Sequence, residues 1–140
     1  MKKQSIDLAT LDTTAACNKG AEIELKHPVT NAPLGVFITV LGRDSDTFKD
    51  YIRHSINDQI RKEAIAKKRG RDMEVQTLEM READTIELLT VCTVGWKNVV
   101  MGGNELPFNV ANAKRVYSDR PWIRQQVNEA IGDLENFMTC

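Results

Sequence analysis

Two patterns of hydrophobic and polar positions alternate along the chain, one typical of strands and one typical of helices. Between residues 21 and 42, Ile23 and Leu25 alternate with charged side chains, and a turn-rich stretch then leads into the run 36–41. Alternation with a period of two predicts a β-strand. The run 36–41 is rich in β-branched and aromatic residues, which favours a second strand. Residues 21–42 are therefore expected to form an antiparallel β-hairpin.

Later segments carry apolar residues at helical spacing. The first has an apolar residue at every fourth position: Phe48, Ile52, Ile56, Ile60 and Ala64. Such a stripe predicts an amphipathic helix, for which Asp44, Ser45 and Asp46 are all suitable N-caps, and Pro121 suits the first turn of the last helix. We expect helices at about residues 46–68, 77–93, 109–118 and 120–138.

The domain organisation follows from these elements. Residues 1–20 are polar and rich in small side chains, so we expect a flexible N-terminal arm with room for a short helical turn. Residues 21–140 are long enough for a single domain. The predicted fold class is α+β, with an N-terminal antiparallel β-hairpin followed by a predominantly helical body of three to four helices.

Charge and hydropathy exclude several classes of partner. The 19 basic and 20 acidic side chains give a net charge of -1, whereas a nucleic-acid or membrane-surface binder usually has a clear basic excess. No apolar run approaches the roughly 18 residues of a membrane span, and the basic start is followed by polar residues, unlike a secretory signal. The basic run 61–71 can be a solvated helix end, a phosphate contact or a steering patch for an acidic protein partner. The first is favoured because no aromatic side chain interleaves the charges.

The sequence offers no group for catalysis. His27 and His54 are the two histidines, and both fall at positions typical of surface residues. Cys17, Cys92 and Cys140 lie too far apart for a zinc motif and are expected to be reduced thiols. We therefore expect a protein that is not an enzyme and has no cofactor and no metal.

Aromatic side chains are concentrated in the last third of the chain, namely Trp96, Phe108, Tyr117 and Trp122. Aromatic residues at this density usually belong to a core. The alternative is an exposed anchor for a partner helix, because tryptophan and tyrosine dominate binding hot spots.

Several short motifs, in order and with their spacing, resemble the tail assembly chaperones of long-tailed bacteriophages. The C-terminal motifs are GWKNV at 95–99, ELPF at 105–108 and PWI at 121–123, and the opening motifs are EIELKHPVT at 22–30 and PLG at 33–35. The resemblance covers most of residues 12–137. Chaperones of this kind are often mostly helical, so the strand pattern at 21–42 is a departure.

The resemblance implies a protein of the host cytoplasm that binds the tape measure protein, a very long and largely helical chain. Such a chaperone keeps the tape measure protein soluble and promotes assembly of the tail tube around it. Contact with the tail tube protein and self-association along the tape are further implications. The alternative function is that of a small structural virion protein, a tail or connector subunit.

A partner helix is expected to bind in a groove through apolar anchors at helical spacing. Our hypothesis places Trp96, Phe108, Tyr117, Trp122 and Ile123 in or beside this groove. Replacing Trp122 by alanine would then weaken tape binding while leaving the fold intact.

Overall fold

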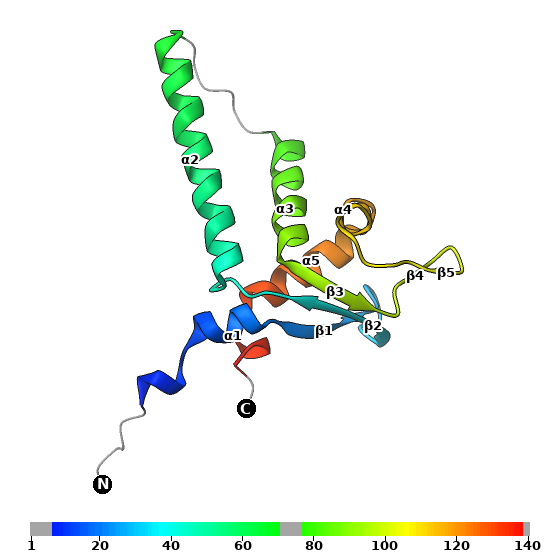
Figure 1. Cartoon of the computed structure of the whole chain (residues 1–140). Helices are drawn as coiled ribbons and strands as arrows, with labels where there is room; N and C mark the ends of the chain where they lie inside the picture. The colour runs from blue at the N-terminus through cyan, green and yellow to red at the C-terminus, as the bar shows by residue number, and fades with distance from the viewer. Residues whose placement is uncertain (1–6, 71–76, 139–140) are drawn as a thin grey trace.

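A small antiparallel sheet lies at one end of the molecule, and a long helical hairpin extends away from it (Figure 1). The computed structural model describes residues 7–70 and 77–138 of the chain. Its elements give an α+β fold, as the sequence predicts.

The sheet consists of β1 (Ala21–Lys26), β2 (Pro33–Val40) and β3 (Thr93–Lys97), in the order β1-β2-β3. The first two strands are the predicted hairpin, which is confirmed, with Ile23 opposite Ile38. The third strand was not predicted. It pairs antiparallel to β2 and places Trp96 opposite Ile38, so the central strand β2 has a hydrogen-bonded neighbour on each side.

His27 organises the loop of the hairpin. Its Nδ1 accepts hydrogen bonds from the backbone amides of Val29 and Thr30, both at 3.1 Å. Asn31 occupies the left-handed region with φ 62°, a conformation that asparagine tolerates better than most residues. The imidazole is therefore used to close a turn.

The described residues contain five α-helices, so the predicted body of three to four helices is wrong. They are α1 (Thr13–Lys19), α2 (Asp46–Lys68), α3 (Leu78–Cys92), α4 (Val110–Asp119) and α5 (Pro121–Gly132). A single last helix over 120–138 was expected, but α5 ends at Gly132. A 3₁₀ turn, Leu134–Asn136, follows it, and the Asp133 side chain caps this turn by accepting from the amide of Glu135 at 3.0 Å. A second 3₁₀ turn, Leu8–Thr10, precedes α1.

Helix α1 lies within the segment expected to be a flexible arm. The Asp12 side chain accepts from the amide of Ala15 at 2.9 Å, which caps the helix. Cys17 is fully buried. Two hydrogen bonds join Asn18 to Asp46 at the start of α2, one from the Asp46 amide at 2.8 Å and one to its carboxylate at 3.1 Å. These contacts fasten the helix to the rest of the fold.

The core lies between the sheet, the C-terminal half of α3, and helices α4 and α5. Its fully or nearly fully buried side chains include Ile38, Val40, Leu89, Cys92, Val116, Tyr117, Val127 and Ile131. Gln126 of α5 closes the edge of β1, because its amide donates to the carbonyl of Lys26 at 2.8 Å and accepts from the Lys26 amide at 2.9 Å.

A small second hairpin extends from the sheet. Strands β4 (Val100–Met101) and β5 (Asn104–Glu105) pair across Gly102 and Gly103, which have φ of 62° and 84°. Two consecutive positive φ angles are typical of the tight turn that two glycines predict. None of the helices within residues 7–70 and 77–138 combines the length and the hydrophobicity that a transmembrane span needs.

Candidate partner-binding surface

A row of exposed apolar side chains lies along α2. No residue of this helix is buried. Ile52, Ile56 and Ile60 are 37%, 54% and 59% exposed, so exposure rises with distance from the sheet. We call these three residues the α2 stripe. Isolated exposed apolar residues are common, but a row at helical spacing on one face is typical of a protein-binding helix.

The base of α2 is fixed to the body of the molecule. Ser45 is buried, and its Oγ accepts from the amide of Phe48 at 3.2 Å. Phe48 packs against the core. The Tyr51 hydroxyl donates to the carbonyl of Asp84 at 3.3 Å and so joins α2 to α3. Partial burial, together with the carboxylates of Glu87 and Asp84, raises the pKa of Tyr51. The stripe is thus presented on a helix that is anchored at one end.

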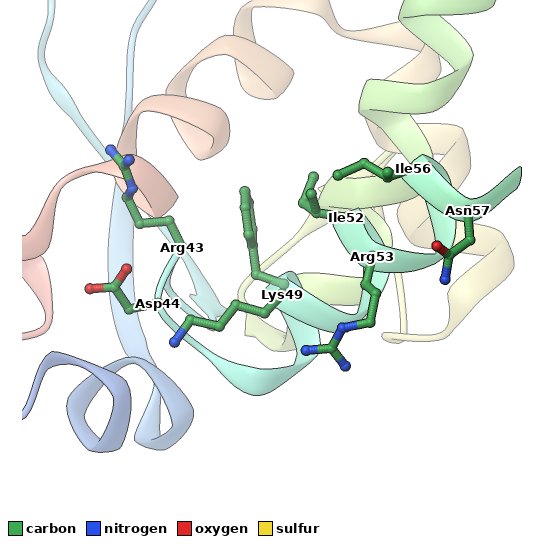
Figure 2. Close-up of a pocket in the computed structure, with 8 residues that line it drawn as sticks. Arg43, Asp44, Lys49, Ile52, Arg53, Ile56 and Asn57 are labelled. Atoms are coloured by element: carbon green, nitrogen blue, oxygen red, sulfur yellow. The ribbon is translucent and has the colours of Figure 1, made fainter. Parts of the chain in front are cut away.

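A groove of about 410 Å³ runs along the N-terminal half of α2. Figure 2 shows Ile52 and Ile56 in one row and the polar side chains of Lys49, Arg53 and Asn57 in a second row beside it. The full lining comprises Arg43, Asp44, Phe48, Lys49, Ile52, Arg53, Ile56 and Asn57. Apolar residues and a mixed-charge rim on one open face suit an amphipathic helix.

Helix α3 leaves the stripe uncovered because its first half is charged. Leu78 and Met80, its first two apolar residues, are themselves 67% and 44% exposed. On α3, Ile86 is the first apolar side chain that packs against the core, and Leu89 is the first that is fully buried.

Two of the five residues predicted to contact a partner belong to the core. Tyr117 is fully buried, and its hydroxyl lies 2.6 Å from Thr93 Oγ1. Burial raises the pKa of Tyr117 to about 12, despite the opposing hydrogen bond with Thr93. Ile123 is 8% exposed. A partner could reach these side chains only by opening the fold.

The other three, Trp96, Phe108 and Trp122, are half-buried and pack against the same core. The Trp96 indole donates to the carbonyl of Leu106 at 2.8 Å, and its ring meets Phe108 edge-on with centroids 5.1 Å apart. The structure therefore brings Trp96 and Phe108 together as a packing pair.

The sequence pattern identified the α2 periodicity but not its role as a surface. A usable signal was present: the first half of α3, which follows α2 across a short connection, is too charged to cover three isoleucines. An apolar stripe whose sequence neighbour cannot cover it predicts an exposed face.

The described residues contain no group of three or more histidine, cysteine or acidic side chains that could hold a metal ion. Cys17 and Cys92 are buried free thiols. Burial raises the pKa of Cys92 to about 11, which keeps this thiol protonated at neutral pH.

Comparison with family models, with curated proteins and with solved structures finds no match to this chain.

Proposed function

We propose that this chain is a non-enzymatic phage tail assembly chaperone that binds the tape measure protein in the host cytoplasm. The observation that carries the proposal is the α2 stripe, a row of exposed isoleucines on a helix that extends from a well-packed body. The resemblance of the motifs at 95–99, 105–108 and 121–123 supplies the class of partner.

The mode of binding is helix against helix. The tape measure protein is a long helical chain, and its apolar face would cover Ile52, Ile56 and Ile60 in place of water. Complete burial of an isoleucine side chain stabilises a complex by about 1.5–3 kcal/mol. Three partly exposed isoleucines therefore support reversible binding, which suits a chaperone that must leave when the tail tube forms.

Holding of this kind needs no cofactor and no nucleotide. A protein that binds exposed apolar helix surface keeps its partner soluble by mass action alone. The function includes presenting the tape to the tail tube protein, and it requires no nucleic acid and no membrane.

Co-expression tests the proposal. The partner is the product of the very long helical reading frame expected immediately downstream. The stripe variant Ile52→Ser/Ile56→Ser/Ile60→Ser is compared with His54→Ser, an exposed change on the opposite face of α2. We expect the soluble yield of the tape measure protein to fall about tenfold with the stripe variant and to remain unchanged with the control. Equal yields with all three proteins would contradict the proposal.

Mass spectrometry of purified particles separates the chaperone from the alternative, a small structural tail or connector subunit. A chaperone is absent from mature virions, whereas a structural subunit is present at a fixed copy number. If the protein is present in virions, the stripe variant would be tested for its effect on particle assembly instead of its effect on the solubility of the tape measure protein.

A further inference from the structure

We propose that two copies of this chain pair through α2, antiparallel, about a two-fold axis at Ile56. The pairing face consists of Lys49, Ile52, Ile56, Ile60 and Glu63, which we call the α2 seam. This inference goes beyond the proposed function and needs no tape measure protein. Because the seam contains the α2 stripe, a second copy and the tape measure protein would bind this face in turn.

The α2 seam has the same spacing from both ends. Successive members are three, four, four and three residues apart, so all five lie on one face of the helix. Ile52 and Ile60 are each four residues from Ile56, and Lys49 and Glu63 are each seven residues from it. A sequence with this symmetry is complementary to its own reverse.

Antiparallel pairing about Ile56 satisfies every member of the seam. Ile56 meets Ile56 of the second copy, and Ile52 meets Ile60. Lys49 meets Glu63 at one end, and symmetry repeats that pair at the other end. Apolar contacts therefore fill the centre, and an opposite-charge pair closes each end.

The helix dipole does not account for the two charged ends of the seam. The helix dipole favours acidic side chains near the N-terminus and basic ones near the C-terminus, but Lys49 lies near the start of α2 and Glu63 near its end. The Lys49 amine makes one exposed hydrogen bond, to Thr14 Oγ1 at 3.3 Å. Glu63 forms no ion pair with any described residue. Pairing between copies gives both charges a partner.

Charges outside the seam select the antiparallel orientation. Asp44, Asp46 and Asp50 lie at the base of α2, and Lys62, Lys67 and Lys68 lie toward its tip. Antiparallel copies bring the acidic base of each helix level with the basic tip of the other. Parallel copies would bring like charges together along the whole helix. The one like-charged level, Arg43 with Arg69 of the second copy, falls at the extreme end, where both exposed side chains can turn into water.

The seam is accessible to a second copy. Helix α3 contacts α2 through Tyr51, whose position on the helix points away from Ile56 and Ile60. The open groove at the base, lined from Arg43 to Asn57, can receive the tip of the second α2 (Figure 2). Ile56 lies close to the middle of the helix Asp46–Lys68, so the two helices would overlap along nearly their full length of about 34 Å.

Charge exchange tests the pairing. Sedimentation velocity over a range of concentrations measures the dissociation constant of the dimer. We expect Lys49→Glu to raise it about tenfold, because two symmetry-related pairs change from attraction to repulsion, and Glu63→Lys to do the same. The double variant Lys49→Glu/Glu63→Lys restores both pairs and should return the constant to within about threefold of the wild type.

Arg61→Glu is the matched control, since it reverses an exposed charge on α2 away from the seam. Its dissociation constant should be close to that of the wild type, and circular dichroism should show all variants folded. A wild-type chain that stays monomeric at its highest soluble concentration would overturn the pairing. So would a dimer that the double variant fails to restore. Either result leaves the co-expression assay with the tape measure protein intact, so the two proposals fail separately.

A cysteine at the two-fold axis gives an independent readout. In a Cys140→Ser background, Ile56→Cys should form a disulfide-linked dimer on mild oxidation, because the axis brings position 56 next to its own copy. His54→Cys, on the opposite face, should remain monomeric. The buried thiols of Cys17 and Cys92 are shielded from this reaction. Equal crosslinking at both positions would contradict the assigned axis.

Discussion

The sheet-bearing body and the α2 helix differ in how they are stabilised. The body has side chains such as Val40, Leu89 and Val127 with no exposed surface, and no buried side-chain nitrogen or oxygen of the described residues lacks a hydrogen-bond partner. Helix α2 is 23 residues long and has no buried residue. The body therefore supplies the stability of the fold, and α2 is left free to present its side chains to other molecules.

Helix α3 is exposed to solvent at its N-terminal end and buried in the body at its C-terminal end. Its N-terminal residue Leu78 is 67% exposed, whereas Leu89 and Cys92 near its C-terminus have no exposed surface. Thr93 then enters the sheet directly and anchors the helix through hydrogen bonds to the Leu89 carbonyl at 2.7 Å and to the Tyr117 hydroxyl at 2.6 Å. The anchored end explains how a long hairpin can extend from a small body.

Truncating one apolar side chain in the body and one on α2 tests most directly whether the body alone supplies the stability. Leu89→Ala removes a fully buried side chain and should lower the free energy of unfolding by about 3 kcal/mol. Ile56→Ala removes a side chain that is 54% exposed and should change it by less than about 0.5 kcal/mol. Urea denaturation, at a concentration low enough for a monomer, measures both. Similar losses at the two positions would show that α2 is part of the cooperative core.

Gly42 tests how tightly the body is packed around α1. A Cβ at this position would clash with Cys17 Sγ and lie 2.8 Å from Cys17 Cβ and 3.1 Å from the ring of Phe137. We expect Gly42→Ala to lower the free energy of unfolding by about 2–3 kcal/mol, because the buried neighbours have little room to move.

Gly132→Ala is the control for this steric argument, since nothing lies within 4 Å of a Cβ there. Thermal unfolding of both variants, followed by circular dichroism, measures the difference. If Gly42→Ala and Gly132→Ala unfold at the same temperature, α1 is not packed against the body in the way that the structure shows.

Tyr117 makes the stability of the body depend on pH. Its pKa is raised from 10.0 to about 12 in the folded state, so the folded chain keeps a proton that the unfolded chain loses. This contribution to stability is complete below pH 10 and is lost as the pH rises toward 12, and it amounts to about 2–3 kcal/mol. Cys92, raised from 9.0 to about 11, acts in the same direction from a lower pH.

Tyr117→Phe removes the tyrosine part of this dependence. The free energy of unfolding, measured at pH 9 and pH 11, should fall less in the variant than in the wild type. At neutral pH the variant should be about 1 kcal/mol less stable, because Thr93 loses one hydrogen-bond partner. An identical alkaline decline in both proteins would exclude Tyr117 as its source.

The sequence predicted those elements that local patterns determine. Helix α2 begins one residue after its cap at Ser45 and ends at Lys68, as its stripe indicates, and alternation at Ile23 and Leu25 identifies β1. Strand β3 was missed because it exists only through pairing with β2, where Trp96 lies opposite Ile38. Helix α1 has seven residues and depends on the burial of Cys17, a contact with distant parts of the chain.

The candidate site was less predictable than the fold. Aromatic residues such as Trp96 and Tyr117 fit a core and a binding site equally well in a sequence, and only tertiary packing shows that they fill the body. The exposure of Ile56 follows from what α3 fails to cover, which no single helix pattern contains. Periodicity therefore identifies an apolar face, and its neighbours decide whether that face is buried.

Removing the N-caps of α2 and α3 should have the smallest effects on the free energy of unfolding. Ser45 caps α2 where it leaves the body and is fully buried, whereas Thr77 caps α3 at the far end and is exposed. Each side chain accepts one backbone amide at 3.2 Å. Ser45→Ala should lower the free energy of global unfolding by about 1 kcal/mol, a usual value for a lost cap. Thr77→Ala should lower it by only a few tenths, because the tip can fray without unfolding the body.

Amide hydrogen exchange makes this last difference visible. In Thr77→Ala, exchange should speed up only in the first turns of α3, and the amides around Leu89 and in the sheet should keep their protection. In Ser45→Ala, protection should fall across α2 and the body together, since this cap lies where the two regions join. Faster exchange throughout the molecule in both variants would mean that the hairpin and the body unfold as one unit. The assignment of stability to the body alone would then be wrong.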